Sequence, residues 1–263
     1  DLGFTPIRTK DFEWALRGNV SFNKNIITKT FYQEFKQVPQ KSSLLSENDN
    51  VYIQGYSVGA WLGYDFAGID PKTGHTLAYA EDGTKVDMDM FNNRTLALKR
   101  PPMHYLGEGN PTTTGGFATE FRYKQWELNA QFEFQTGHLI PTISSTMNHN
   151  YNYSGNRYIA DQYRWRAVGD VAERPYLGIN NTAYDQYRFN TSLEKGDYLR
   201  CTYTSLGYRL TEELCKKLSV RSARIAITAS NLFTLTNFKG IDPASMGTLS
   251  YPSTRTYSIT LNV

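Results

Sequence analysis

Alternation of apolar and polar residues, sustained over runs of about ten residues, is the feature that most constrains this chain. The last quarter of the sequence holds three such runs, at Asp197–Leu210, Val220–Phe233 and Thr254–Val263. In the last run one face would carry Tyr257, Ile259, Leu261 and Val263, and the other Thr256, Ser258, Thr260 and Asn262. A tilted strand of about ten residues is long enough to cross a bilayer. The pattern therefore predicts an all-β chain of membrane-spanning strands.

The run at Asp197–Leu210 breaks this alternation once. Leu199 and Cys201 would lie on one face, whereas Leu206 and Tyr208 would lie on the other. One extra residue in a strand reverses the side of everything after it. We therefore predict a β-bulge near Thr202–Thr204.

The clearest hairpin is predicted at Gly115–Tyr123 and Trp126–Phe134, joined by the two residues Lys124 and Gln125. One face is aromatic and aliphatic, and the other carries Glu120, Arg122, Glu127, Asn129, Gln131 and Glu133. Burying so many charges in a dry core would be very costly. An apolar face toward lipid and a polar face toward a wet lumen satisfies both sets. We expect Trp126, Leu128, Phe132, Tyr257, Ile259 and Leu261 to face lipid, and Glu127, Asn129, Gln131, Glu133, Thr256 and Thr260 to face the lumen.

Further strands are predicted at Asp1–Arg8, Phe12–Phe22 and Tyr56–Asp70. Toward the C-terminus the connections alternate between short (124–125, 211–219) and long (137–195, 234–253). Outer-membrane barrels show this asymmetry, with short periplasmic turns and long extracellular loops. The segment 24–56 would be a long periplasmic excursion or would contain another strand.

The long connection 137–195 is rich in Tyr, Trp and Arg, residues that are enriched at binding hot spots. A loop of this length is usually functional or disordered, and its aromatic content argues against disorder. The candidate residues for contact with a substrate or a partner are Tyr151, Tyr153, Tyr158, Tyr163, Trp165, Arg166 and Asp170. The alternative is that Trp165 and Arg166 only hold the loop against the rim of the barrel.

Several classes of function lack their signatures. The four histidines lie at no metal-ligand spacing, and the acidic stretch around Gly83 reads as a polar hairpin turn instead of a calcium loop. No nucleophile elbow, Walker loop or dinucleotide fingerprint is present. The net charge of +3 is too small to suggest a nucleic-acid partner. We therefore expect no enzymatic activity, no metal and no cofactor; a Cys201–Cys215 disulfide is possible but not favoured.

Four C-terminal motifs, in order, resemble the end of SusC/RagA-type TonB-dependent outer-membrane transporters. They are GDYLR (196–200), LGYRL (206–210), NLFTLTNFKGIDP (231–243) and YPSTRTYSITLNV (251–263). FEWALRGNVSFNKN, GGFATEFRYKQWELNAQFEF and YRWRAVGD resemble the same family earlier in the chain. Two departures are Ala244, where the family usually has Glu, and a last residue, Val263, where the family usually ends in an aromatic residue.

The resemblance implies that residues 1–263 are the C-terminal portion of a large antiparallel barrel of about 22 strands with long extracellular loops. It places the plug domain, the TonB-contacting segment and the signal peptide outside this chain, whose start at Asp1 reads as the middle of a strand. It further implies a location in the outer membrane of Bacteroidota, nutrient uptake by import of glycans (oligosaccharides) or peptides, energy supplied through TonB, and a SusD-like lipoprotein as partner.

Two other architectures fit the alternation. One is a complete barrel of about eight strands with a structural or adhesive role. The other is a secreted β-sandwich that binds carbohydrate through Tyr and Trp, since sandwich strands also alternate. A sandwich would cover the apolar face of Trp126–Phe134 with a second sheet, whereas a membrane barrel would leave it facing outward.

Overall fold

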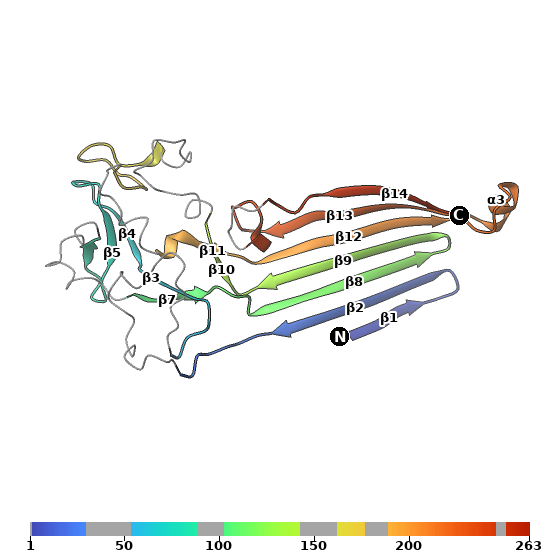
Figure 1. Ribbon diagram of the computed structural model, residues 1–263, viewed down its shortest axis with the longest axis horizontal. Helices are drawn as coiled ribbons and strands as arrows, with labels where there is room; N and C mark the ends of the chain where they lie inside the picture. The colour runs from blue at the N-terminus through green and yellow to red at the C-terminus, as the bar shows by residue number, and fades with distance from the viewer. Residues whose placement is uncertain (1, 30–53, 89–102, 143–161, 177–188, 246–250) are drawn as a thin grey trace.

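In the computed structural model, which describes residues 2–29, 54–88, 103–142, 162–176, 189–245 and 251–263, one long sheet dominates the chain (Figure 1). The sheet has seven strands in the order β1-β2-β8-β9-β12-β13-β14, and every neighbouring pair is antiparallel. The strands are β1 (Leu2–Arg8), β2 (Phe12–Phe22), β8 (Thr113–Tyr123), β9 (Trp126–Thr136), β12 (Tyr198–Arg209), β13 (Arg224–Thr236) and β14 (Thr256–Asn262). The predicted all-β architecture is confirmed.

The connections divide between the two ends of the sheet. The short ones join β1 to β2, β8 to β9 and, through the small helix α3 (Glu212–Lys217), β12 to β13. At the other end lie the long connections 23–112, 137–197 and 237–255 (Figure 1). Residues 23–29 therefore leave the sheet at the end that carries the long connections, whereas residues 30–53, where another strand was the alternative, lie outside the described residues. The expected excursion at the short-turn end is wrong, because β2 runs toward the long-connection end.

The predicted hairpin and bulge are both confirmed. Lys124 and Gln125 alone separate β8 from β9, and the φ of Lys124 is 53°, the left-handed conformation that a tight two-residue turn requires. In β12 the register with both neighbours shifts between Cys201 and Tyr203. Leu199 then pairs with Phe134, and Leu206 with Leu128, so the apolar residues on both sides of the shift share one face.

The boundary predicted at Val220 is displaced. The amide of Val220 donates to the carbonyl of Cys215, and Ser219 has a φ of 56°, so the turn after α3 continues and β13 begins only at Arg224. The two cysteines are free and buried.

Smaller sheets form at the long-connection end. β3 (Ala60–Gly63) pairs with β7 (His104–Glu108), and β10 (Leu139–Pro141) with β11 (Leu193–Lys195). β4 (Phe66–Ile69), β5 (Thr76–Tyr79) and β6 (Lys85–Asp87) form a three-stranded sheet that includes the hairpin turn expected at the acidic stretch. Two 3-10 turns, η5 (Asn190–Ser192) and η6 (Pro243–Ser245), complete the set.

The single strand predicted over Tyr56–Asp70 is wrong. Residues 60–63 and 66–69 belong to different sheets, and Tyr64 between them forms a bridge with Phe189. The side chain of Asn190 continues this contact: its amide nitrogen donates to Asp65 at 2.9 Å, and its oxygen accepts from the amide of Phe66 at 3.1 Å. A segment more than a hundred residues away thus divides the run.

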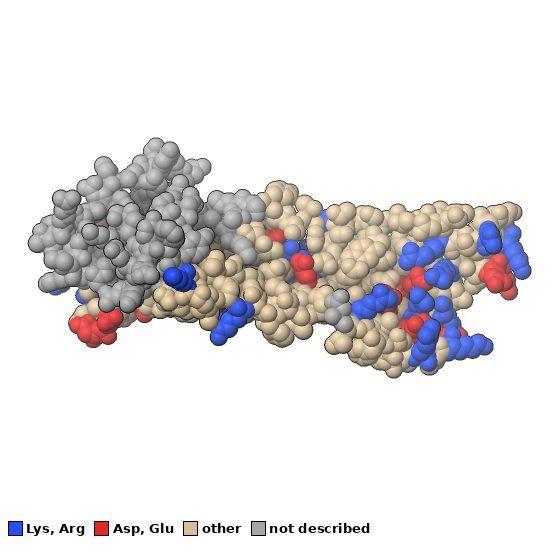
Figure 2. Space-filling model, turned by 60° about the horizontal axis from the view of Figure 1, so that its bottom comes forward, with Lys and Arg blue, Asp and Glu red and all other residues tan. Residues whose placement is uncertain are grey.

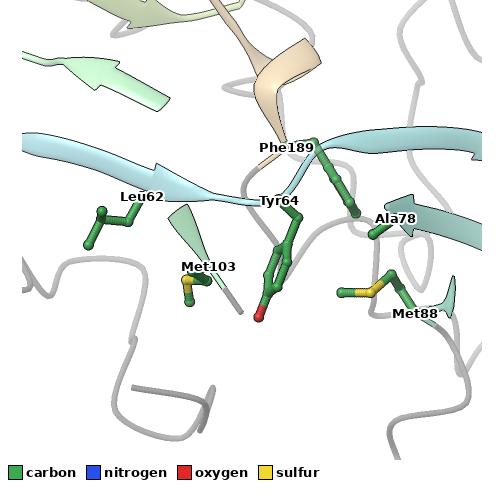
Figure 3. Packing of buried hydrophobic residues seen from close by; sticks show 6 residues of the cluster. All are labelled: Leu62, Tyr64, Ala78, Met88, Met103 and Phe189. Atoms are coloured by element: carbon green, nitrogen blue, oxygen red, sulfur yellow. The ribbon is translucent and has the colours of Figure 1, made fainter. Parts of the chain in front are cut away.

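A small core holds this end together (Figure 3). Its buried members are Leu62, Tyr64, Ala78, Met88, Met103 and Phe189. Phe189 is completely buried and packs edge-on against Phe66, with ring centroids 5.6 Å apart. The long connections therefore contribute a packed unit to this end of the sheet. Within the described ranges, no helix combines the length and the apolar character needed to span a membrane.

Candidate functional site on the two faces of the sheet and its long-connection end

The sheet has one polar and one apolar face across its seven strands. On β9 the residues Glu127, Asn129, Gln131 and Glu133 point to the same side, and their cross-strand partners are polar or small. The registered pairs on this side include Arg122↔Glu127, Glu120↔Asn129, Ser205↔Asn129, Tyr203↔Gln131 and Arg200↔Glu133. The polar face is hollowed into a pocket of about 340 Å³, whose lining includes Glu120, Asn129, Gln131 and Tyr203.

Glu127 is the centre of an ion cluster near the short-connection end. One carboxylate oxygen lies 2.6 Å from the guanidinium of Arg209, and the other accepts a hydrogen bond from Nε of Arg224 at 3.0 Å. Within this cluster the side chain of Glu127 is buried. Gly207 leaves room for the Arg224 side chain in this position, because a Cβ there would lie 2.7 Å from the guanidinium.

A second ion pair fixes the connection between β13 and β14 to the polar face. The guanidinium of Arg200 lies 2.5 Å from Asp242 and also donates to the hydroxyls of Thr234 and Ser253, each at 3.1 Å. Burial by itself would raise the pKa of Asp242. The backbone amides of Ala244 and Ser253, together with Arg200, stabilise the carboxylate enough that its pKa lies below its ordinary value.

Charged side chains of the seven strands are therefore concentrated on one face of the sheet. Figure 2 shows basic and acidic residues interleaved toward the short-connection end, with a smaller group farther along the sheet. The sequence placed Glu127 and Glu133 on this face, but their partners Arg200, Arg209 and Arg224 were missed, and so was the pairing of Asp242 with Arg200. The charge signs were visible in the sequence, but the pairing depends on register across β9, β12 and β13.

The opposite face is apolar and open to the surroundings. Aromatic rings pack across neighbouring strands: the ring centroids of Phe117 and Phe132 lie 4.6 Å apart, and those of Trp14 and Phe121 lie 5.5 Å apart. Ile259 is 78% exposed, and Trp126, Leu128, Tyr257 and Leu261 are exposed too, whereas Phe132 is half-buried among neighbouring rings. None of the described residues forms a second layer over this face. Thr256 and Thr260 are exposed as well, because β14 lies at the sheet edge.

The predicted loop candidates divide into two groups. Tyr151, Tyr153 and Tyr158 lie outside the described residues. Trp165 donates through Nε1 to the carbonyl of Pro71 at 3.0 Å, so it fastens its loop to the turn after β4. Asp170 accepts hydrogen bonds from the amides of Arg166 and Ala167, and the Arg166 guanidinium donates to the carbonyl of Gln162.

These contacts give Trp165, Arg166 and Asp170 a local structural role, which was the alternative considered for the tryptophan and arginine. Tyr163 is 57% exposed, whereas Trp165 is only partly exposed.

A buried histidine lies where β9 ends and the long connection begins. His138 is 3% exposed, and neither ring nitrogen has a hydrogen-bond partner among the described residues. The ring packs on Gly196, where a Cβ would lie 2.4 Å from Nε2. Burial lowers the pKa of His138, and the nearby charge of Asp197 opposes this effect only in part.

Comparisons with known proteins identify proteins that are similar to this chain. No protein-family model matches the chain. It is 23% identical over 280 residues to "TonB-dependent receptor P3" of Formosa agariphila and 22% identical over 271 residues to "TonB-dependent receptor SusC" of Bacteroides thetaiotaomicron. Each alignment covers 98% of this chain, which spans about a quarter of the length of these relatives, 27% and 25% respectively.

Solved structures give the same result for the fold. "Structure of the RagAB peptide transporter" matches with a TM-score of 0.72 at 23% identity, over 98% of this chain and 28% of the matched chain. A second RagAB structure, described as being in the "open-open" state, matches with a TM-score of 0.69 at 22% identity. The matched proteins are named as receptors or transporters, which agrees with the expected outer-membrane location and with the expectation of no enzymatic activity. The resemblance of this chain to SusC/RagA-type TonB-dependent receptors, predicted from its motifs, is thereby confirmed over nearly its whole length.

Proposed function

We propose that this chain forms the C-terminal part of the barrel of a TonB-dependent importer that carries oligosaccharides or peptides across the outer membrane. One observation carries the proposal: a sheet of seven antiparallel strands exposes a continuous apolar face and holds its charges on the other face. In water such an apolar surface would be an aggregation liability, whereas in a bilayer it is the surface required.

In this proposal the apolar face, with Trp126, Leu128, Phe132, Tyr257, Ile259 and Leu261, contacts lipid. The polar face, with Glu127, Asn129, Gln131, Glu133, Thr256 and Thr260, lines a water-filled lumen. Alternation along β9 and β14 supports the assignment, because the two sets occupy opposite sides of the same strands.

The edges of the sheet support membership of a larger barrel. Among the described strands, β1 pairs only with β2 and β14 only with β13. An open edge is not tolerated in hydrocarbon, because its amides and carbonyls would be unpaired. Further strands of the same protein, to a total of about 22, would complete the barrel. The plug domain and the TonB-contacting segment would belong to the remainder of the protein.

The long-connection end is the proposed site of substrate capture and of docking of a SusD-like surface lipoprotein. Its packed core and its ion pairs hold the loops in place above the lumen. Tyr163 and the cluster Tyr151, Tyr153 and Tyr158 remain the candidate contacts, whereas the contacts of Trp165, Arg166 and Asp170 favour a supporting role. One matched structure is named as a peptide transporter, which supports including peptides among the candidate substrates.

The two rival architectures are less compatible with the geometry. A sandwich would cover the apolar face, yet Ile259 is largely exposed and the described residues supply no second sheet above it. A small closed barrel would pair its first and last strands, but β1 and β14 lie at opposite edges.

Uptake by the source bacterium tests the proposal. We expect deletion of the full-length gene to abolish growth on one class of nutrient, defined peptides or defined oligosaccharides, and complementation to restore it. Complementation with a variant lacking the TonB-contacting segment should fail although the protein reaches the outer membrane. Normal growth of the deletion strain on every peptide and glycan supplied would contradict an import role.

A further inference from the structure

We propose that helix α3 is a membrane-surface anchor: Leu214 and Leu218 insert among the phospholipids of the leaflet at the short-connection end, and Lys216 and Lys217 contact their phosphates. The inference rests on the proposed function, because it requires the sheet to cross a bilayer. It adds a lipid contact outside the strands.

A row of aromatic side chains marks where the hydrocarbon would end. Tyr123, Trp126 and Tyr208 are registered neighbours on β8, β9 and β12, on the apolar face and within one residue of the strand ends that border the short connections. Tyr123 and Trp126 are exposed, and the rings of Trp126 and Tyr208 lie 4.9 Å apart. Nζ of Lys124 lies 5.5 Å from the centroid of the Tyr123 ring. Girdles of Tyr and Trp occupy the membrane–water interface of outer-membrane barrels.

The position of α3 relative to this row sets its depth. β12 ends at Arg209, one residue past Tyr208, and α3 begins three residues later at Glu212. Figure 1 shows α3 just beyond the short-connection end of the sheet. A helix placed there lies at the level of the phospholipid headgroups.

The residues of α3 fit that level. Leu214 lies in α3 and Leu218 is its C-terminal cap, whose amide donates to the carbonyl of Leu214; the two are one helical turn apart, on the same side, and are 44% and 60% exposed. The neighbouring side of the helix faces the chain, where Cys215 is buried and its Sγ lies 3.8 Å from the carbonyl of Leu210. Lys216 and Lys217 are exposed in the last turn. An apolar stripe beside flexible basic side chains is the pattern of interfacial helices, in which lysines reach toward phosphates.

Lipid is a better occupant for this stripe than a protein partner. Two leucines, one in a six-residue helix and one at its C-terminal cap, offer far less area than the roughly 800 Å² that each partner usually contributes to a stable interface. The chain also continues from α3 into the apolar face on both sides, through Tyr208 and Ile225. A lipid contact extends a surface that the proposed barrel already uses.

Quenching by brominated lipid tests the proposal in the full-length protein. Leu218→Cys is labelled with a thiol-reactive environment-sensitive fluorophore, and the protein is reconstituted in vesicles of phosphatidylcholine and phosphatidylglycerol with or without brominated acyl chains. Glu212→Cys, on another side of the same helix, is the matched control, and Ile259→Cys reports on the sheet face. The unmutated protein gives the labelling background, since Cys201 and Cys215 are buried.

We expect brominated lipid to quench the probe at Leu218 at least twofold more than the probe at Glu212. Lys216→Gln combined with Lys217→Gln should reduce this quenching in vesicles that contain phosphatidylglycerol. Equal, weak quenching at Leu218 and Glu212 with strong quenching at Ile259 would overturn the anchor and leave the barrel proposal standing. Weak quenching at Ile259 as well would contradict the proposed function itself.

Discussion

The guanidinium of Arg200 on β12 and the carboxylate of Asp242 after β13 lie 2.5 Å apart, with 7% and 8% of their side chains exposed. This contact connects the wall of the sheet to the connection that returns to β14. Because the hydroxyls of Thr234 and Ser253 and two backbone amides complete the network, neither charge lacks a partner.

Removal of one charge should therefore be costly. Asp242→Asn leaves Arg200 buried without its counter-ion, and we expect a loss of about 3–5 kcal/mol in the free energy of unfolding. Unfolding of the full-length protein in detergent measures it. Glu133→Gln is the matched control, because its carboxylate lies 3.8 Å from Arg200 and is 44% exposed, so it should cost less than about 1 kcal/mol. Equal losses in the two variants would contradict a dominant role for the Arg200–Asp242 contact.

The two faces of β14 give a second prediction. Ile259→Arg should destabilise the protein in lipid by roughly 2–4 kcal/mol if the residue lies near the bilayer midplane, whereas Thr260→Arg should cost much less because its side chain reaches water. The two positions are adjacent and are both exposed in the chain alone, so the two variants differ mainly in the face of the sheet that carries the new arginine. Urea unfolding from lipid vesicles measures both, and a larger loss for Thr260→Arg would reverse the assignment.

His138 makes stability depend on pH. Its pKa is lowered in the folded protein, so the unfolded chain binds the proton more tightly. The contribution of His138 to the free energy of unfolding is therefore fully present above the ordinary histidine pKa of about 6.5. It falls as the pH drops toward the pKa of His138 in the folded protein, by at most about 1.4 kcal/mol per pH unit. His138→Phe should flatten the unfolding free energy between pH 7 and pH 5 relative to the unmutated protein. An unchanged slope in this variant would mean that other groups carry the pH dependence.

The tyrosine cluster of the long connection tests substrate capture. We expect Tyr151→Ala, Tyr153→Ala and Tyr158→Ala together to weaken nutrient uptake or co-purification of the partner lipoprotein, because exposed aromatics contribute strongly to such contacts. Trp165→Phe is the control: it removes the hydrogen bond to Pro71, so it should alter the local loop and leave the ligand contacts in place. Wild-type growth, affinity and co-purification in the triple variant, with the barrel intact, would exclude a binding role for the cluster.

The sheet could be predicted from the sequence because its strands follow a two-residue period that the final fold preserves. The predicted bulge illustrates this well: Leu199 and Leu206 were assigned to opposite faces by counting, and one register shift places both on the apolar face. Even the two-residue turn at Lys124 and Gln125 required no information from distant residues.

The long-connection end could not be predicted in the same way, because contacts distant in sequence determine it. Tyr64 and Asp65 divide a run that alternates cleanly, since Phe189 and Asn190 bind there. The ion pairs were missed for a related reason. Glu127 meets Arg209 and Arg224 only once the register of three strands is fixed, and no local pattern contains that register.

The most direct test is the structure of the full-length protein in a lipid nanodisc, determined by electron cryo-microscopy. The account predicts that β1 and β14 each pair with a further strand of the same polypeptide, that Ile259 faces lipid, and that Glu127 faces the interior of a closed barrel. A protein layer packed over Ile259, or direct pairing of β1 with β14, would contradict it.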